Sequence, residues 1–322
     1  MNWKEDYFAK LGSAHIDLEQ IDNAQRIKLN HMPSNLYKYR QVNEFSLKNL
    51  ENDTVYLNSP SEYNDPFEFV EAIDFVKINN MIEKKYQDEL VAKLLKHYPV
   101  PEKILYEAKD SDSPLAIISE YQLERYQGFT KEQAEKTTKI LNEMMQKSMI
   151  DAGEKKLAYM QSQMKVCSFC ESPNQLLMWG HYADCHKGFC IEYNISKWSK
   201  DDVRNRLLSP VVYLNSLYDA TEHLINQING EGFNNIYPFI SGAIKSKEWE
   251  YEKEWRLIFP IGPSFPRQDY PMGCQSKVIL GARMTENNKQ RITSMCFEKG
   301  IKVMQAKPST TEYKLDFASV IP

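Results

Sequence analysis

The spacing of apolar residues divides the chain into short strand-like runs and longer helix-like runs. Short apolar or alternating runs, which are typical of strands, occupy residues 36–40, 55–57, 165–170, 187–195, 209–215, 276–284 and 301–306. Patterns that are typical of helices occupy residues 45–50, 174–184, 219–246 and 285–300. These elements follow one another without a regular β–α–β order. We therefore expect an α+β fold with mixed or antiparallel sheets.

Residues from about 77 to 163 differ in character from the rest of the chain. This stretch is rich in Lys, Glu, Gln, Met and Leu and has almost no strand pattern. Thr130 and Gln133 have the spacing of a capping box, which predicts the start of a helix. We expect an all-helical insertion here, inside a single α+β domain of residues 35–322. A helical N-terminal segment, residues 1–34, precedes that domain.

Composition limits the kind of protein and its expected location. The chain has 322 residues, of which 42% are hydrophobic, so it can bury a large core. A formal net charge of −4 argues against a broad basic surface for nucleic acid. The sequence has no apolar run long enough to cross a bilayer, and its first residues lack the apolar core of a signal peptide. We expect a cytoplasmic protein with no membrane partner.

The cysteines are expected to be reduced thiols, because a cytoplasmic protein rarely keeps disulfides. Cys167 and Cys170 have the spacing of a zinc-binding pair, and further Cys and His residues follow them. The overall spacing matches no standard structural zinc site. A strand over residues 165–170 would also point these two thiols to opposite faces. We favour buried free cysteines and expect no metal site.

The segment Lys247–Pro260, KEWEYEKEWRLIFP, places glutamates at alternate positions directly before an apolar run. If a strand begins near Glu252, then Glu252, Glu254 and Arg256 share one face. Trp255 would then point into the core with the alternate residues that follow it. The glutamates form either a solvated strand edge or a pair of catalytic carboxylates.

The strand at residues 36–40 carries a candidate anion-binding pair. Lys38 and Arg40 share one face, and an arginine fork matches the geometry of a phosphate. Tyr37 and Tyr39 would lie on the other face. A surface strand with tyrosines facing the core explains the same pattern.

Two further segments can contribute to a pocket. The loop after residue 57 carries Ser59, Ser61, Asn64 and Asp65, which either form turns or line a site. The helix at 174–184 carries His181 and Tyr182. These two residues either make structural contacts or face a ligand.

Four segments resemble, in order, the markers of a bacterial family, the domain of unknown function DUF2971. They are LYKYR, VYLNSPSEYNDPFE, NQLLMWGHYADCHKGFCIEY and YEKEWRLIF. They span roughly residues 35–260, interrupted by the helical stretch. The family label carries no settled activity, although some members occur near defence and mobile-element genes.

The arrangement is also similar to that of ADP-ribosyltransferases, which implies a related core and NAD⁺ as co-substrate. Arg40 resembles the first-strand arginine of those enzymes, Ser59-Pro60-Ser61 their serine motif, and Glu252-x-Glu254 their acidic motif. The catalytic residues implied are Glu254, Glu252 and Arg40. The cofactor-binding residues implied are Lys38, Tyr39, Arg40, Ser59, Ser61, Asn64, Asp65, His181 and Tyr182.

The resemblance also implies a role for each end of such a site. Arg40, with Lys38, would bind the diphosphate, and tyrosines such as Tyr63 would enclose the nicotinamide. Glu254 would stabilise positive charge on the sugar, while Glu252 orients or deprotonates the acceptor. The acceptor would be a macromolecule, either protein or nucleic acid.

Three hypotheses for function follow. The first is an NAD-dependent ADP-ribosyltransferase, or an NAD hydrolase, that acts as a bacterial toxin or phage-defence effector. The second is a non-catalytic binding or regulatory module of a defence system, with a protein partner on the helical insertion. The third is a metal-dependent hydrolase or nuclease. Its candidate residues are Asp65, Glu68, His181, Asp184 and Glu192.

Overall fold

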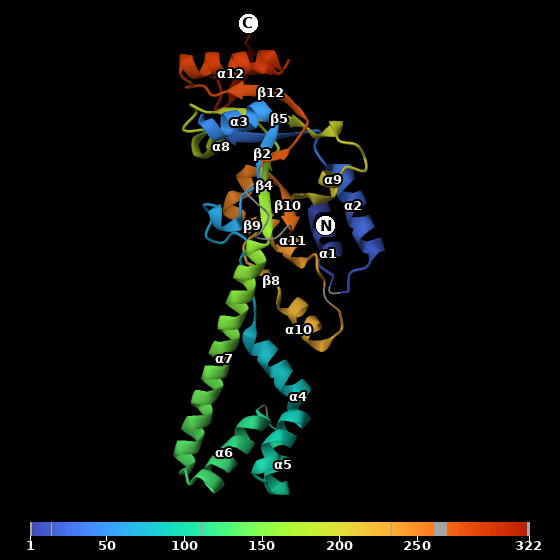
Figure 1. Ribbon diagram of the computed structural model, residues 1–322, viewed down its shortest axis with the longest axis vertical. Helices are drawn as coiled ribbons and strands as arrows, with labels where there is room; N and C mark the ends of the chain where they lie inside the picture. The colour runs from blue at the N-terminus through green and yellow to red at the C-terminus, as the bar shows by residue number, and fades with distance from the viewer. Residues whose placement is uncertain are drawn as a thin grey trace. The chain divides into compact units, whose positions relative to one another are not determined.

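The computed structural model describes residues 2–13, 15–109, 111, 113–232, 234–260 and 269–320. The chain divides into two compact units, which Figure 1 shows coloured along the chain. Unit 1 comprises Met1–Glu71, Met160–Tyr218 and Asn234–Pro322. Unit 2 comprises Ala72–Tyr159 and Asp219–Phe233.

Unit 1 combines a large sheet with short helices and smaller strands. Its helices are α1 (Trp3–Leu11), α2 (Leu18–His31), α3 (Glu44–Asn52), α8 (Leu176–Tyr182), α9 (Val203–Leu207), α11 (Tyr237–Ser241) and α12 (Glu286–Glu298). Its 3-10 helices are η1 (Pro60–Glu62), η2 (Ile195–Lys197) and η3 (Lys247–Glu252). The smaller strands are β2 (Thr54–Tyr56), β7 (Val212–Leu214), β9 (Ile244–Ser246) and β11 (Asp269–Pro271).

Within the described residues, eight strands form one sheet in the order β14-β13-β12-β5-β1-β4-β10-β6. They are β1 (Asn35–Arg40), β4 (Met164–Cys170), β5 (Phe189–Asn194), β6 (Leu208–Pro210), β10 (Glu254–Pro260), β12 (Gln275–Leu280), β13 (Lys302–Pro308) and β14 (Leu315–Ser319). β12 and β13 are parallel, and the other neighbouring pairs are antiparallel. The expected mix of helices with a mixed sheet is confirmed.

The large sheet is weakly joined between β1 and β4. β1 registers with β5 along its whole length, from Asn35 to Arg40, and β4 registers in the same way with β10. Between β1 and β4, the described register consists of the pair Tyr37 and Cys170. Because the ladder there is one pair long, side chains from both faces of the sheet can reach the space beside it.

The core of unit 1 follows the predicted alternation. Trp255, Leu257 and Phe259 are buried together with Leu36 and Phe169 on one face of the sheet. Residues two apart on a strand share a face, so the polar positions of β10 are directed to the opposite face. This alternation puts Glu254 and Arg256 on the same side of the sheet.

The N-terminal helices α1 and α2 lie side by side and pack on other elements of unit 1 (Figure 1). Trp3 stacks on Trp255, with ring centroids 6.1 Å apart. The buried Lys28 ammonium donates to the carbonyls of Asn205 and Leu208, both at 2.7 Å. These contacts anchor the two helices to the strand that carries Glu254 and to the end of α9.

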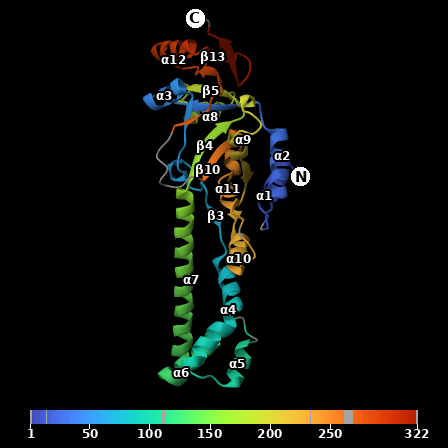
Figure 2. The same cartoon turned by 45° about the vertical axis from the view of Figure 1, so that its right-hand side comes forward.

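Unit 2 is helical. Its helices are α4 (Phe75–His97), α5 (Glu102–Lys109), α6 (Pro114–Gln127), α7 (Lys131–Ser162) and α10 (Thr221–Asn229). Figure 2 shows α5 beside α6, and α10 beside α4, in agreement with their contacts. The predicted capping box is present, because the Gln133 N–H donates to Thr130 Oγ1 at 3.3 Å and the Thr130 N–H donates to Gln133 Oε1 at 2.9 Å. Strands β3 (Glu71–Ala72) and β8 (Tyr218–Asp219) lie where the chain passes between the units.

Two sequence predictions about secondary structure are wrong. Residues 219–246 do not form one helix, because α10 stops at Gly230, whose φ of 74° is left-handed. Helix α11 and strand β9 follow instead. Glu252 lies on η3 and not on the glutamate strand, since Lys253 adopts a φ of 45° and separates η3 from β10.

The cysteines are free thiols, as predicted. Cys167 and Cys170 belong to different hydrophobic clusters on the two faces of β4, and Cys185 is exposed. None of the helices in the described ranges is long and apolar enough to cross a bilayer.

Candidate functional site

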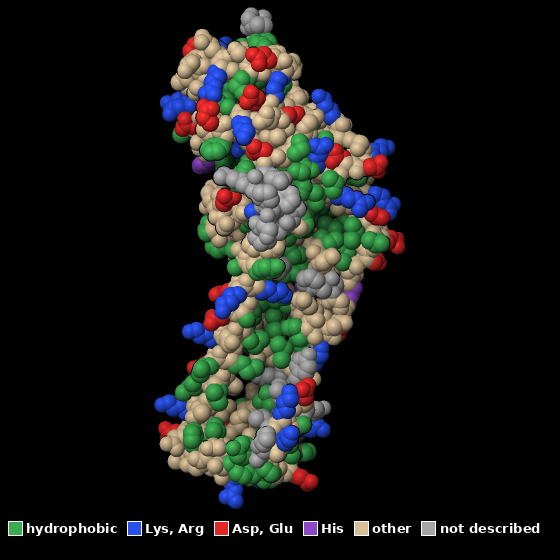
Figure 3. Space-filling view, in the orientation of Figure 1, with side chains coloured by type: hydrophobic (Ala, Val, Ile, Leu, Met, Phe, Trp, Pro, Cys, Tyr) green, Lys and Arg blue, Asp and Glu red, His purple; other side chains and the backbone are tan. Residues whose placement is uncertain are grey.

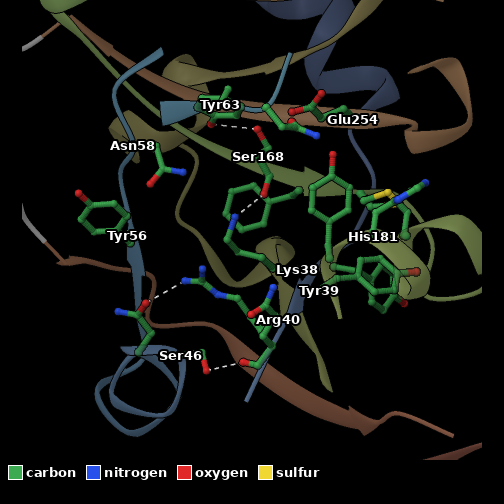
Figure 4. Close-up of a pocket in the computed structure, with 18 of the residues that line it drawn as sticks. Lys38, Tyr39, Arg40, Ser46, Tyr56, Asn58, Tyr63, Ser168, His181 and Glu254 are labelled. Carbon is green, nitrogen blue, oxygen red and sulfur yellow. Dashed lines mark hydrogen bonds between the residues drawn. The ribbon is translucent and has the colours of Figure 1, made fainter. Parts of the chain in front are cut away.

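A cavity of about 780 Å³ opens in unit 1 beside the single registered pair of β1 and β4. Its walls come from β1, α3, β2, the chain around η1, β4, α8, β9, η3, β10 and β11. Figure 4 shows Glu254 at one end and Arg40 at the other, with Ser168 and Lys38 between them. This volume lies in the range of small-molecule sites.

The Glu254 end of the cavity is a buried network of charges. Glu252 and Glu254 are 2% and 3% exposed, so the hypothesis of a solvated strand edge is wrong. Arg256, which is fully buried, donates from Nε to Glu254 Oε1 at 2.9 Å and from Nη2 to Oε2 at 3.1 Å. The same guanidinium also pairs with Glu68, through Nη2 and Oε2 at 3.1 Å.

A lysine bridges the two glutamates. Lys245 Nζ lies 2.6 Å from Glu252 Oε2 and 3.4 Å from Glu254 Oε2. Lys245 belongs to β9, which runs parallel to β7. In the register of these two strands, Lys245 lies opposite Tyr213. The Tyr213 hydroxyl accepts the backbone N–H of Glu254 at 2.8 Å. The β7–β9 pair therefore supplies a cation and a hydroxyl to the first residue of β10.

The two carboxylates have pKa values shifted in opposite directions. Burial alone would raise the pKa of Glu254, but Arg256 and Lys245 more than offset this effect and hold it at about 2. Burial and the charge of Glu254 raise the pKa of Glu252, against the opposing effects of Lys245 and Tyr182. Glu254 is therefore a permanent carboxylate, whereas Glu252 can take up a proton more readily.

Tyr182 connects α8 to this pair. Its hydroxyl donates to Glu252 Oε1 at 2.7 Å. Burial and the nearby Glu252 raise the pKa of Tyr182, so the hydroxyl keeps its proton and acts as a donor. His181 precedes it on the exposed side of α8 and also lines the cavity.

The opposite end of the cavity carries the cations Lys38 and Arg40 together with the Asp269 carboxylate, which accepts from Asn49 Nδ2 at 2.8 Å. Lys38 Nζ donates to the carbonyl of Ser168 at 2.7 Å, which takes one of its three protons. Arg40 Nη2 donates to Asn49 Oδ1 at 2.8 Å. Within the described residues, the buried Arg40 Nε–H has no acceptor. Burial lowers the pKa of the Lys38 ammonium, and Arg40 carries the guanidinium that suits an anionic ligand.

Aromatic rings cover much of the wall between the two ends. The rings that line the cavity are those of Tyr37, Tyr39, Phe45, Tyr56, Tyr63, Phe169, His181 and Tyr182. Tyr39 is held by the core, because its ring packs edge-on against Trp179 and its hydroxyl donates to the Ser172 carbonyl at 2.8 Å. Flat apolar surfaces with a few polar groups suit a ligand that contains planar rings.

Comparison with known proteins identifies one segment of this site. Residues 178–257 match DUF2971, a family of proteins of unknown function. The match confirms the DUF2971 resemblance for this part of the chain. No curated protein and no solved structure matches the chain.

The DUF2971 segment carries the carboxylate end of the cavity. Tyr182, Lys245, Glu252, Glu254 and Arg256 all lie within residues 178–257. The cationic end comes from β1, which lies outside the matched segment. Folding therefore brings the DUF2971 segment together with a strand from near the start of the chain.

Most of the predicted site residues line this one cavity. They are Lys38, Tyr39, Arg40, Asn64, His181, Tyr182, Glu252 and Glu254. Ser59, Ser61 and Asp65 are not among the residues that line it. Ser59 accepts a hydrogen bond from Lys165 Nζ at 2.6 Å, and the Asp65 carboxylate accepts the Phe67 N–H at 2.9 Å.

The metal-site hypothesis gains no support from the described residues, which contain no group of three or more His, Cys, Asp or Glu placed to hold an ion. Glu68 is paired with Arg256. Glu192 is paired with Lys277 at 2.6 Å and accepts from the Tyr37 hydroxyl. The proposed ligands therefore belong to separate interactions.

Sequence reasoning missed Lys245 and the role of Glu68. Lys245 lies on β9, inside a region that was predicted to be helical. Glu68 is 188 residues away from Arg256 along the chain. Because buried carboxylates are normally paired with a cation, a nearby lysine or arginine could be expected. The sequence does not indicate which residue provides that cation.

Proposed function

We propose that unit 1 uses this cavity to cleave NAD⁺ and to transfer ADP-ribose to an acceptor, or to water. The observation that carries the proposal is the pairing of two chemically different ends in one cavity. Lys38 and Arg40 offer donors to a diphosphate at one end. Glu252 and Glu254 form a carboxylate pair with divergent pKa values at the other.

Each end matches a part of NAD⁺. Arginine and lysine bind phosphate oxygens through charge-assisted hydrogen bonds, so the diphosphate fits beside Arg40. Aromatic side chains such as Tyr63 suit the flat nicotinamide ring. Breaking the bond between nicotinamide and ribose builds positive charge on the sugar carbon, which a fixed carboxylate stabilises.

The two carboxylates then have different roles. Glu254 stays ionised and presents negative charge to the sugar, and Arg256 holds its orientation through two hydrogen bonds. Glu252 is the carboxylate that can accept a proton. Nicotinamide leaves with the electron pair of the broken bond. The acceptor atom attacks the sugar carbon, and the acceptor proton passes to Glu252.

A second candidate function is a binding module with a protein partner on unit 2. The observation that favours it is a set of exposed apolar side chains on α7. They are Ile140, Leu141, Met144, Met145 and Ile150, which are 40% to 63% exposed. Figure 3 shows hydrophobic side chains at the surface of the unit 2 helices. A role as a toxin or phage-defence effector is compatible with either function and stays a prediction.

Transfer of label from NAD⁺ labelled on its adenylate tests the proposal. We expect the purified protein to label macromolecules in a bacterial lysate. Glu252→Gln should lower the rate by about a hundredfold or more, because a general base is lost. Glu254→Gln should have a comparable effect, because charge stabilisation is lost. Glu250→Gln, at an exposed position on the same 3-10 helix, is the matched control and should retain full activity.

The digestion that removes the label names the acceptor. Loss after protease treatment indicates a protein, and loss after nuclease treatment indicates a nucleic acid. Free ADP-ribose without labelled macromolecule would make the protein an NAD⁺ hydrolase. The absence of NAD⁺ turnover by folded wild-type protein, in lysates from healthy and from infected cells, would contradict the proposal and favour the binding module. Thermal melting of each variant separates a loss of chemistry from a loss of folding.

A further inference from the structure

Lys245 occupies the space between the two carboxylates of the cavity. Its side chain is 5% exposed, and its ammonium contacts Glu252 at 2.6 Å and Glu254 at 3.4 Å. The same nitrogen lies 4.5 Å from the centroid of the Trp249 ring. Two carboxylates and an aromatic face therefore lie around one positive charge, and each of these groups attracts a buried ammonium.

The balance of buried charges around Lys245 indicates the role of its ammonium group. The buried carboxylates are those of Glu68, Glu252 and Glu254, and the buried cations are those of Lys245 and Arg256. Arg256 is engaged by Glu68 and Glu254. Within the described residues, Lys245 is therefore the cation that pairs with Glu252.

Groups from several elements face Glu252. They are Lys245 on β9, Glu254 on β10, Tyr182 on α8, Tyr213 on β7, Cys170 on β4 and the neighbouring Tyr251. Glu254 is negative and opposes ionisation of Glu252, whereas the hydroxyl of Tyr182 donates to it. Lys245 supplies the positive charge in this set. Without it, the two carboxylates would be balanced by Arg256, which is already shared with Glu68, and by the more distant Lys38, which interacts with Glu254.

We propose that Lys245 is a positioning residue of the cavity, whose ammonium is the resident counter-ion that favours the ionised form of Glu252, the form that can accept a proton. The identity of the proton donor, an acceptor of ADP-ribose, rests on the proposed function. The counter-ion role itself does not, because it concerns the charge state of Glu252 in the free protein.

A titration of the Glu252 side chain tests this role without any turnover. Protein labelled with ¹³C at the glutamate carboxyl groups is titrated by NMR, and the Glu252 resonance is assigned by its absence in Glu252→Gln. In Lys245→Met we expect the Glu252 midpoint to move upward by about 1–3 pH units, since a neighbouring positive charge is lost. Lys245→Arg should restore a midpoint close to that of the wild type. Lys277→Met, a partly exposed lysine paired with Glu192, is the control and should leave Glu252 unchanged.

An unchanged Glu252 midpoint in folded Lys245→Met would overturn the proposal. If that variant does not fold, the proposal is tested from the other side of the ion pair, by measuring the reactivity of Lys245 when Glu252 is replaced. Lys245 should be methylated faster by formaldehyde and a mild reductant in Glu252→Gln than in the wild type, because the ion pair that holds the ammonium is lost. Equal methylation in the two proteins would also overturn the proposal. Where NAD⁺ turnover is found, Lys245→Met should move the acid limb of its pH profile in the same upward direction.

Discussion

At the scale of single residues, Arg256 holds the carboxylate end together. Its guanidinium is fully buried and pairs with both Glu254 and Glu68. Its charged centre also lies 5.7 Å from the ring centroid of Tyr63, which lines the cavity. A buried ion pair contributes little net stability compared with apolar side chains of similar shape, but removing one partner leaves an uncompensated charge. The stability of this network is therefore sensitive to the loss of either the arginine or a glutamate.

Replacing Arg256 with Met should destabilise the protein. Glu254 and Glu68 would keep their burial but lose the arginine that they share, so the free energy of unfolding should fall by about 3–5 kcal/mol. Urea denaturation measures this change. Arg26→Met, at an exposed position of α2, is the control and should change stability by less than about 0.5 kcal/mol. A loss below about 1 kcal/mol for Arg256→Met would contradict the network described here.

Local sequence pattern anticipated only part of this residue network. Alternation along the strand placed Glu254 and Arg256 on one face and Trp255 on the other, and the structure confirms both. The partners of these residues come from distant chain segments. Contacts such as that of Arg256 with Glu68 depend on the tertiary fold, so no spacing in one sequence reveals them.

At the scale of elements, the turn between α8 and β5 sets the position of β1. Asp184, Cys185 and His186 have φ values of 46°, 50° and 69°, so this turn is left-handed over consecutive non-glycine residues. Gly188 follows, and a Cβ on it would lie 2.1 Å from the Arg40 carbonyl oxygen. Close approach of the two backbones therefore requires glycine at the start of β5.

Gly188→Ala should disturb the end of β1 that carries Arg40. The added methyl group must displace the backbone of Arg40 or of Ala183, which should cost about 1–3 kcal/mol. Gly180→Ala is the matched control, because no described atom outside its own helix backbone and chain neighbours lies within 4 Å of its Cβ position, and alanine favours the α8 helix. Thermal melting should show a lower midpoint for Gly188→Ala and an equal or higher one for Gly180→Ala. Equal midpoints for Gly188→Ala and wild type would contradict the close packing.

The helices and strands that the sequence predicted correctly are those in which apolar residues recur with a clear helical or strand spacing. The strands at β1, β4, β5, β10, β12 and β13 and the helices α3, α7, α8 and α12 occur where apolar spacing and capping residues placed them. The short pieces between residues 230 and 252 were not anticipated. α11, β9 and η3 are each too short to show a period, and tertiary packing decides their form.

At the scale of the whole molecule, the described cavity belongs to unit 1 alone. Its two ends come from segments that are far apart along the chain, β1 at Asn35–Arg40 and β10 at Glu254–Pro260. The α7 surface belongs to unit 2 and contributes no residue to the cavity. The catalysis proposed for unit 1 and the partner binding proposed as the alternative for unit 2 can therefore be tested by separate substitutions.

The central claim is that the cavity binds NAD⁺ with its diphosphate beside Arg40, and calorimetric titration tests this most directly. We expect wild-type protein to bind NAD⁺ at one site. Arg40→Gln should weaken binding about tenfold or more, because a charge-assisted hydrogen bond is lost. Arg26→Gln, at an exposed position outside the cavity, should bind like the wild type. Failure of the wild type to bind NAD⁺, or equal binding by Arg40→Gln, would contradict the account.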